Sequence, residues 1–175
     1  MTVDTGTRLA ALRVKMREAG VDLVALGPGS HMQWAAGFHP HADERPCLLL
    51  IGPEREAFLM PALNAEGSRE ETAIVFHTWD DAIGPDAALA AALADVGAAQ
   101  AGHVVLDETM RADFALLLLG ALPGARHSFT DSTIGALRMR KDAAEFAKLK
   151  MNAGIADRAI QAAFAAARPG MTELE

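Results

Sequence analysis

Cysteine and aromatic residues are scarce in this chain. Its 175 residues include one cysteine, no tyrosine and only 5% aromatic residues, so no internal disulfide can stabilise the fold. Cys47 lies in the apolar run 46–51, where we expect a small core side chain. A catalytic thiol is the less favoured alternative, because a nucleophilic thiol needs a polar, cation-rich setting. A single reduced cysteine is typical of a cytoplasmic protein.

Long apolar stretches and excess positive charge are also missing. No apolar stretch reaches the roughly 18 residues of a membrane span, and residues 1–4 lack the basic and apolar regions of a signal peptide. The net charge is −7 and the isoelectric point is about 5.3. Both values argue against nucleic acids and anionic membranes as partners. We therefore expect a cytoplasmic protein that binds neither nucleic acid nor membrane.

Common catalytic motifs are absent as well. There is no GxSxG motif, so nothing in the sequence indicates a serine hydrolase. There is also no GxGxxG or GxxxxGK[ST] motif, so nothing indicates a loop that binds nucleotide phosphates. The adjacent acidic pairs Asp80–Asp81 and Asp107–Glu108 fit strand ends and helix caps, and we expect the two side chains of each pair to diverge. Four scattered histidines are expected to be structural or on the surface: His31, His77, His103 and His127. We predict no metal site in this chain.

Apolar periodicity predicts alternating helices and strands. Helices are expected at 9–19, 30–36, 61–71, 86–96 and 109–122, and strands at 21–26, 47–51, 57–60, 73–77, 104–106 and 126–129. Ser30 is the expected N-cap of its helix, and residues 52–55 form a hairpin turn. The run 116–119 looks buried. This alternation, with one hairpin inside it, predicts an α/β fold with a mixed β-sheet flanked by helices.

The pattern changes after Asp131. Asp142 and Glu145 form a capping signal, and apolar residues then recur at intervals of three and four as far as about Arg168. This predicts one long amphipathic helix. We expect an α/β domain over 1–135, followed by a linker and long helix over 136–175.

The last residues carry a second capping signal. Thr172 followed by Glu175 is a capping box, which predicts a further helix that would continue past Glu175. The alternative is a frayed tail in which Leu174-Glu175 derives from a cloning site.

The segment 38–46 contains the best candidates for chemistry. His39 and His41 are two positions apart in an extended loop, so both rings can face one ligand. A zinc site needs three or four ligands, and only Asp43 and Glu44 are near, so a solvated loop is favoured over a metal site. Arg45 can bind a carboxylate through a bidentate fork, or cap the end of the sheet. His39, His41 and Arg45 are therefore candidates for substrate contact.

Five segments, in order, resemble the N-terminal domain of the creatinase/prolidase (Xaa-Pro aminopeptidase and dipeptidase) family. They are Leu12-Arg13 with Met16 and Gly20-Val21-Asp22; Pro28 to Phe38; Arg45-Pro46; Leu137 to Phe146; and Gly170 to Glu175. The His39-Pro40-His41 sequence matches no specificity pattern within the family, so the resemblance leaves the substrate open.

The resemblance implies a second half that carries the chemistry. Family members hold two divalent metals (Mn, Co or Zn) in a C-terminal pita-bread domain through two Asp, one His and two Glu. The full-length protein would be expected to use such metals to activate water for attack on an amide-like carbonyl. That domain would begin near the helix from Asp142 and continue past Glu175. It would be this chain's own partner, and this chain would be inactive alone.

The resemblance implies that the N-terminal domain supports homodimerisation and that its loop can overhang the partner subunit's active site. His39, His41 and Arg45 fall in or beside that loop, so they would contact a peptide or small amide substrate. Three alternatives stay open: a stand-alone binding or dimerisation module, the N-terminal domain of a creatinase-type amidinohydrolase, and an unrelated small α/β enzyme that uses those three residues.

Overall fold

The computed structural model describes residues 5–172 and 174 of the chain. The chain divides into two compact units, Met1–Arg138 and Met139–Glu175, and each is treated by itself. Among residues 5–172, no helix combines the length and the apolar character needed to cross a membrane.

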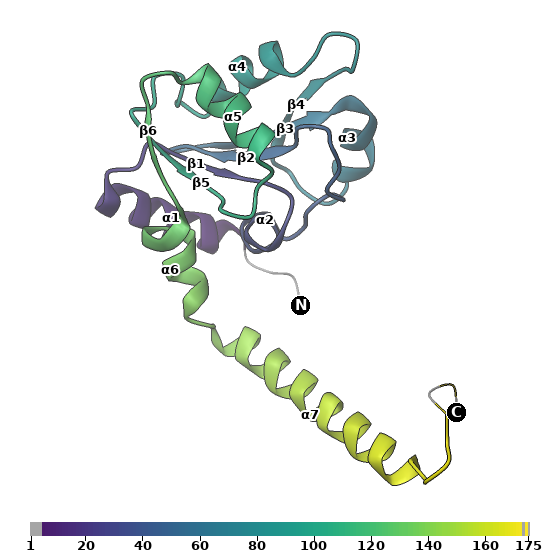
Figure 1. Cartoon of the computed structure of the whole chain (residues 1–175). Helices are drawn as coiled ribbons and strands as arrows, with labels where there is room; N and C mark the ends of the chain where they lie inside the picture. Colours follow the sequence, from purple (N-terminus) through teal and green to yellow (C-terminus); the bar gives the residue numbers. More distant parts are fainter. Residues whose placement is uncertain (1–4, 173, 175) are drawn as a thin grey trace. The chain divides into compact units, whose positions relative to one another are not determined.

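The first unit is built on one six-stranded mixed sheet with strand order β4-β3-β2-β1-β5-β6 (Figure 1). Its strands are β1 (Leu23–Leu26), β2 (Leu48–Ile51), β3 (Glu56–Pro61), β4 (Val75–Trp79), β5 (His103–Leu106) and β6 (Arg126–Ser128). Among these strands only β2 runs opposite to the others. The predicted mixed sheet, including the hairpin between β2 and β3, is confirmed.

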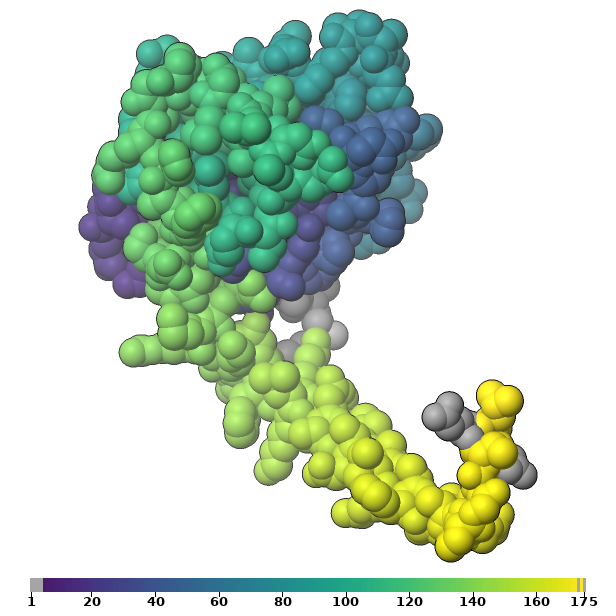
Figure 2. Space-filling view, in the orientation of Figure 1, coloured from purple at the N-terminus to yellow at the C-terminus, as the bar shows by residue number. Residues whose placement is uncertain are grey.

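Helices cover both faces of the sheet, so the unit has three layers (Figure 1). The helices α4 (Asp86–Asp95) and α5 (Ala112–Ala121) pack on one face, where Leu23 and Ala25 point. Figure 2 shows atoms of these two helices, teal and green, over the upper part of the unit. The other face receives Val24 and Leu26 together with α1 (Thr5–Ala19), α2 (Ser30–Ala36), α3 (Ala62–Ser68) and α6 (Ile134–Met139). Because both faces are covered, β1 and β2 are apolar at every position rather than alternating.

A close approach between two elements depends on Gly52, the residue after β2. A Cβ placed there would lie 1.9 Å from the backbone oxygen of Val96, the C-cap of α4. Only glycine therefore lets the β2–β3 hairpin reach the end of α4. Gly37 has a different role, because it ends α2 in the left-handed conformation with φ 85°.

The second unit is dominated by α7 (Ala143–Ala166), which confirms the predicted long helix. Asp142 accepts a hydrogen bond from the backbone N–H of Glu145, whose side chain accepts from the backbone N–H of Asp142, so the predicted capping box is present. None of the residues of α7, all of them described, is buried. Its exposed apolar side chains include Phe146, Leu149, Ile160 and Phe164. At 1.5 Å per residue the helix is about 36 Å long.

Several local predictions were wrong. Ser30 is the first residue of α2 and Gly29 holds the N-cap position, so Ser30 is not the cap. Leu116 is 68% exposed, because the helical period turns it away from the sheet. Helix α5 begins at Ala112 instead of 109, since Asp107 and Thr109 form a hydrogen-bonded turn first.

The segment after β6 contains two elements that the sequence did not predict. They are a 3-10 turn, η1 (Thr130–Ser132), and α6. The predicted capping box of Thr172 and Glu175 lies outside the described residues, because the placement of Glu175 is not described.

Candidate functional site

One edge of the sheet gathers most of the polar groups of interest. The strands β1, β3, β4 and β5 run in one direction and β2 runs in the other. The C-terminal ends of those four strands therefore lie at the same edge of the sheet as the N-terminal end of β2. We call this the carboxyl edge. The loop 38–46 leads into β2, and the segments after β1, β4 and β5 carry His31, Asp81 and Asp107.

Two aromatic contacts fasten the loop 38–46 to the sheet. The ring of Phe38 lies 5.4 Å from that of Phe58, a fully buried residue of β3. At the other end of the loop, the indole N–H of Trp79 donates to the backbone oxygen of Pro46 at 2.9 Å. The side chains of His39 and His41 are exposed between these anchors. The Nδ1 of His39 lies 2.9 Å from the backbone oxygen of Pro40, which accepts a hydrogen bond from it.

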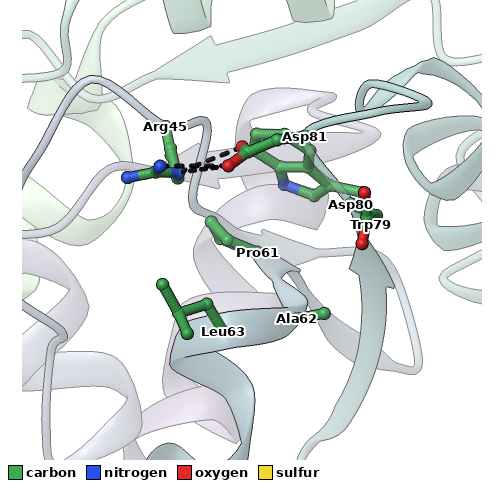
Figure 3. Close-up of a pocket in the computed structure, with 7 residues that line it drawn as sticks. All are labelled: Arg45, Pro61, Ala62, Leu63, Trp79, Asp80 and Asp81. Atoms are coloured by element: carbon green, nitrogen blue, oxygen red, sulfur yellow. Dashed lines mark hydrogen bonds and ion pairs between the residues drawn. The ribbon is translucent and has the colours of Figure 1, made fainter.

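The guanidinium of Arg45 forms an ion pair with Asp81, the second residue after β4. Its Nε lies 3.0 Å from one carboxylate oxygen of Asp81 and its Nη2 lies 3.0 Å from the other, a bidentate pair (Figure 3). The hydrogen bond and the positive charge of Arg45 lower the pKa of Asp81, against a smaller opposing effect of burial. Arg45 therefore ties the loop to the end of β4.

This ion pair forms one wall of a small surface pocket of about 90 Å³. Figure 3 shows it with Pro61, Ala62, Leu63, Trp79 and Asp80 as the other lining residues. A volume of that size holds a few waters or one small side chain, so the pocket in this form is too small for a dipeptide.

A second polar cluster lies where β1 and β5 end. His31 on α2 and the consecutive Asp107 and Glu108 after β5 each place one ligand-type atom within 4.8 Å of the other two. His31 and Asp107 are buried, and the Glu108 side chain is 45% exposed. Glu108 accepts hydrogen bonds from the Thr130 hydroxyl at 2.8 and 2.9 Å. Contrary to expectation, the adjacent acidic side chains converge on one histidine.

The electrostatics of this cluster favour an ionised Glu108. Burial is the largest single influence and raises the pKa of Glu108. Its own backbone N–H, the Thr130 hydroxyl and the neighbouring His31 together outweigh burial, so the pKa of Glu108 lies below its ordinary value. On the other side of the ring, Nη1 of Arg138 donates to Nδ1 of His31 at 2.8 Å.

The predicted site residues differ in whether the structure gives them a polar partner from a distant element. It pairs Arg45 with Asp81, while among the described residues the only three-ligand group contains neither His39 nor His41. Sequence reasoning missed the cluster of His31, Asp107 and Glu108. The available signal was position: these residues follow two buried strands, and parallel neighbours place their ends together.

Known proteins share the sequence pattern and the fold of this chain. Residues 8–140 match the family model of the Creatinase/Prolidase N-terminal domain. The solved dipeptidase of Pyrococcus horikoshii OT3 is 26% identical over 96% of this chain and 46% of its own, with a TM-score of 0.81. The recombinant prolidase of Thermococcus sibiricus is 22% identical over 100% of this chain and 48% of its own, with a TM-score of 0.86.

A shorter relative is the Creatinase/Prolidase N-terminal domain of a Streptococcus pyogenes X-Pro dipeptidase. It is 15% identical over 71% of this chain and 94% of its own, with a TM-score of 0.64. No curated protein gives a significant match. The chain spans less than half the length of the Pyrococcus and Thermococcus proteins. With a family match over most of its length and the same mixed-sheet fold, the chain belongs to the Creatinase/Prolidase N-terminal domain family.

Proposed function

We propose that this chain is the non-catalytic N-terminal domain of a prolidase-type Xaa-Pro dipeptidase or aminopeptidase. The observation that carries the proposal is the likeness, over 96% of this chain, to just under half of a dipeptidase. Further structural neighbours are described as prolidases and as an Xaa-Pro dipeptidase of Bacillus anthracis.

The partner we propose for α7 is the chain's own C-terminal catalytic domain. Phe146, Leu149, Ile160 and Phe164 follow the helical spacing of one face, and each is at least half exposed. An apolar stripe of this kind is typical of a helix that is covered by another domain.

The metals of such an enzyme do not fit this chain. The family resemblance implies two divalent ions (Mn, Co or Zn) held by two Asp, one His and two Glu. The cluster at the carboxyl edge has only one residue of each type, and residues 139–175 contain no histidine. We therefore assign the hydrolytic step to the catalytic domain and none of it to this chain.

For this chain we propose two supporting roles, homodimerisation and shaping of the substrate pocket. The exposed His39 and His41 lie in a loop that is held at both ends, which suits contact with a peptide or small amide substrate. Arg45 would bind a substrate carboxylate only if its ion pair with Asp81 were broken first. The buried, single Cys47 fits a cytoplasmic location.

The first experiment compares two lengths of protein. We expect no Xaa-Pro cleavage by the 175-residue chain with Mn²⁺ or Co²⁺, and cleavage by a longer chain that includes the catalytic half. Turnover by the short chain would refute its assignment as non-catalytic. Hydrolysis of creatine instead of Xaa-Pro dipeptides by the longer chain would favour the creatinase-type alternative, which the family match also allows.

A second experiment tests the docking face of α7. The catalytic half is expressed separately and its binding to this chain is measured by calorimetry. We expect Phe146→Glu and Ile160→Glu to abolish binding, because each buries a charge in the interface. Met151→Glu is the matched control, since at 3.6 residues per turn it lies on the opposite side of α7. Equal binding by all three variants would contradict the proposal.

A further inference from the structure

The cluster of His31, Asp107 and Glu108 lies at the carboxyl ends of the neighbouring strands β1 and β5. From β1 the chain continues through α2 to β2 on one side, while from β5 it continues through α5 to β6 on the other. The carboxyl ends of β1 and β5 therefore flank the point where the winding of the sheet reverses. In open α/β sheets, ligands bind in the crevice outside this point.

The side chains there have the chemistry of a cation site. One imidazole nitrogen and two carboxylates are a ligand set suited to a divalent transition metal. The Nε2 of His31 lies 3.4 Å from Oε1 of Glu108. Two ligands bound at about 2.1 Å from a tetrahedral ion are separated by about 3.4 Å, so this pair already has the spacing of adjacent ligands.

An independent observation comes from Asp107. This residue is only 3% exposed, and its Oδ1 accepts from both the backbone N–H and the hydroxyl of Thr109. Its Oδ2 is buried and has no hydrogen-bond partner among the described residues. Buried carboxylate oxygens are rarely left without a donor or a cation, so Oδ2 needs a ligand that the described residues do not supply.

Arg138 favours one tautomer of the neutral His31 ring. A guanidinium can only donate, so Nδ1 of His31 accepts from it and Nε2 of the neutral ring carries the proton. A cation bound to Nε2 requires that proton to move to Nδ1, where it would face another donor. Arg138 must therefore swing away when a cation binds.

We propose that His31, Asp107 and Glu108 bind one divalent transition-metal cation, with Zn²⁺ as the best match, and that the guanidinium of Arg138 competes with it. The half-exposed Glu108 provides the entry path. The proposal concerns only residues of this chain. It does not depend on the activity of the parent enzyme.

The test is titration of the metal-free 175-residue chain with ZnCl₂ by calorimetry and with CoCl₂ by visible absorption. We expect one equivalent to bind, with Co²⁺ bands typical of nitrogen and oxygen ligands. Asp107→Asn and Glu108→Gln should each weaken binding at least about tenfold, and Arg138→Met should strengthen it by about tenfold. Nitrogen NMR of the His31 ring should show the proton moving from Nε2 to Nδ1 as Zn²⁺ is added.

Two controls guard against adventitious binding. His127→Ala and Asp131→Asn remove exposed groups outside the cluster and should leave the affinity unchanged. Circular dichroism checks each fold, and if Asp107→Asn fails to fold, the half-exposed Glu108→Gln carries the test. The proposal is overturned if the wild-type chain binds no Zn²⁺, if Glu108→Gln binds as tightly as wild type, or if Arg138→Met weakens binding.

Discussion

Replacing Gly52 with alanine is the sharpest test of how the sheet meets its helices. The added Cβ would lie 1.9 Å from the backbone oxygen of Val96, whereas real Cβ contacts stay above 3.0 Å, so at least 1.1 Å of movement is needed. That oxygen belongs to backbone at the end of α4, and the Val96 side chain is buried. Movement there disturbs core packing, which typically costs about 1–3 kcal/mol, and we expect about 3 because backbone must shift.

The assay is urea unfolding followed by circular dichroism. With a slope of roughly 2 kcal/mol per molar urea, a loss of about 3 kcal/mol lowers the midpoint by about 1.5 M. Gly120→Ala is the matched control, because a Cβ at this helical position meets nothing within 4 Å. It should raise the free energy of unfolding by about 0.5–1 kcal/mol. A Gly52→Ala loss below about 1 kcal/mol would refute the close approach.

Two further predictions concern single ionisable groups. The pKa of Asp81 is held below its ordinary value of 3.8 by Arg45, so its contribution to stability is present above that value and is lost as the pH falls through the folded-state pKa. Arg45→Ala should return the pKa of Asp81, followed by carboxyl NMR, to near 3.8; an unchanged titration would contradict the pair. Burial, with a smaller effect of Asp43, raises the pKa of Cys47 to about 12. Roughly one thiol in 10,000 is then ionised at pH 8, so the native protein should not react with a thiol reagent until it is unfolded. Rapid labelling of the native chain would show that Cys47 is accessible.

Local chemistry explains why most elements were predictable. The strands β1, β2 and β5 are short apolar runs bounded by turn residues, and Asp142 and Glu145 mark the start of α7. These signals act between residues a few positions apart. Helix α6 and the turn before it escaped prediction because they are short, and because Ile134 is held by packing against the core instead of by a strong local pattern.

The candidate site was predictable only in part, because its contacts join distant residues. Arg45 was singled out from its place before an apolar strand, yet its partner Asp81 lies 36 positions further along. His31 and Glu108 are 77 positions apart, and nothing in either local sequence indicates the other. Their meeting follows from the parallel pairing of β1 with β5, which is a property of the folded sheet.

The sequence by itself therefore determined the order of the elements, the start of the long helix and the resemblance to the creatinase/prolidase N-terminal domains. Periodicity, turn residues and caps are short-range effects that a linear chain already contains. Only the tertiary structure decided that Arg45 pairs with Asp81, that Leu116 faces away from the core, and that His31 meets Asp107 and Glu108. Those outcomes depend on strand order and register, which arise when distant apolar surfaces are buried together.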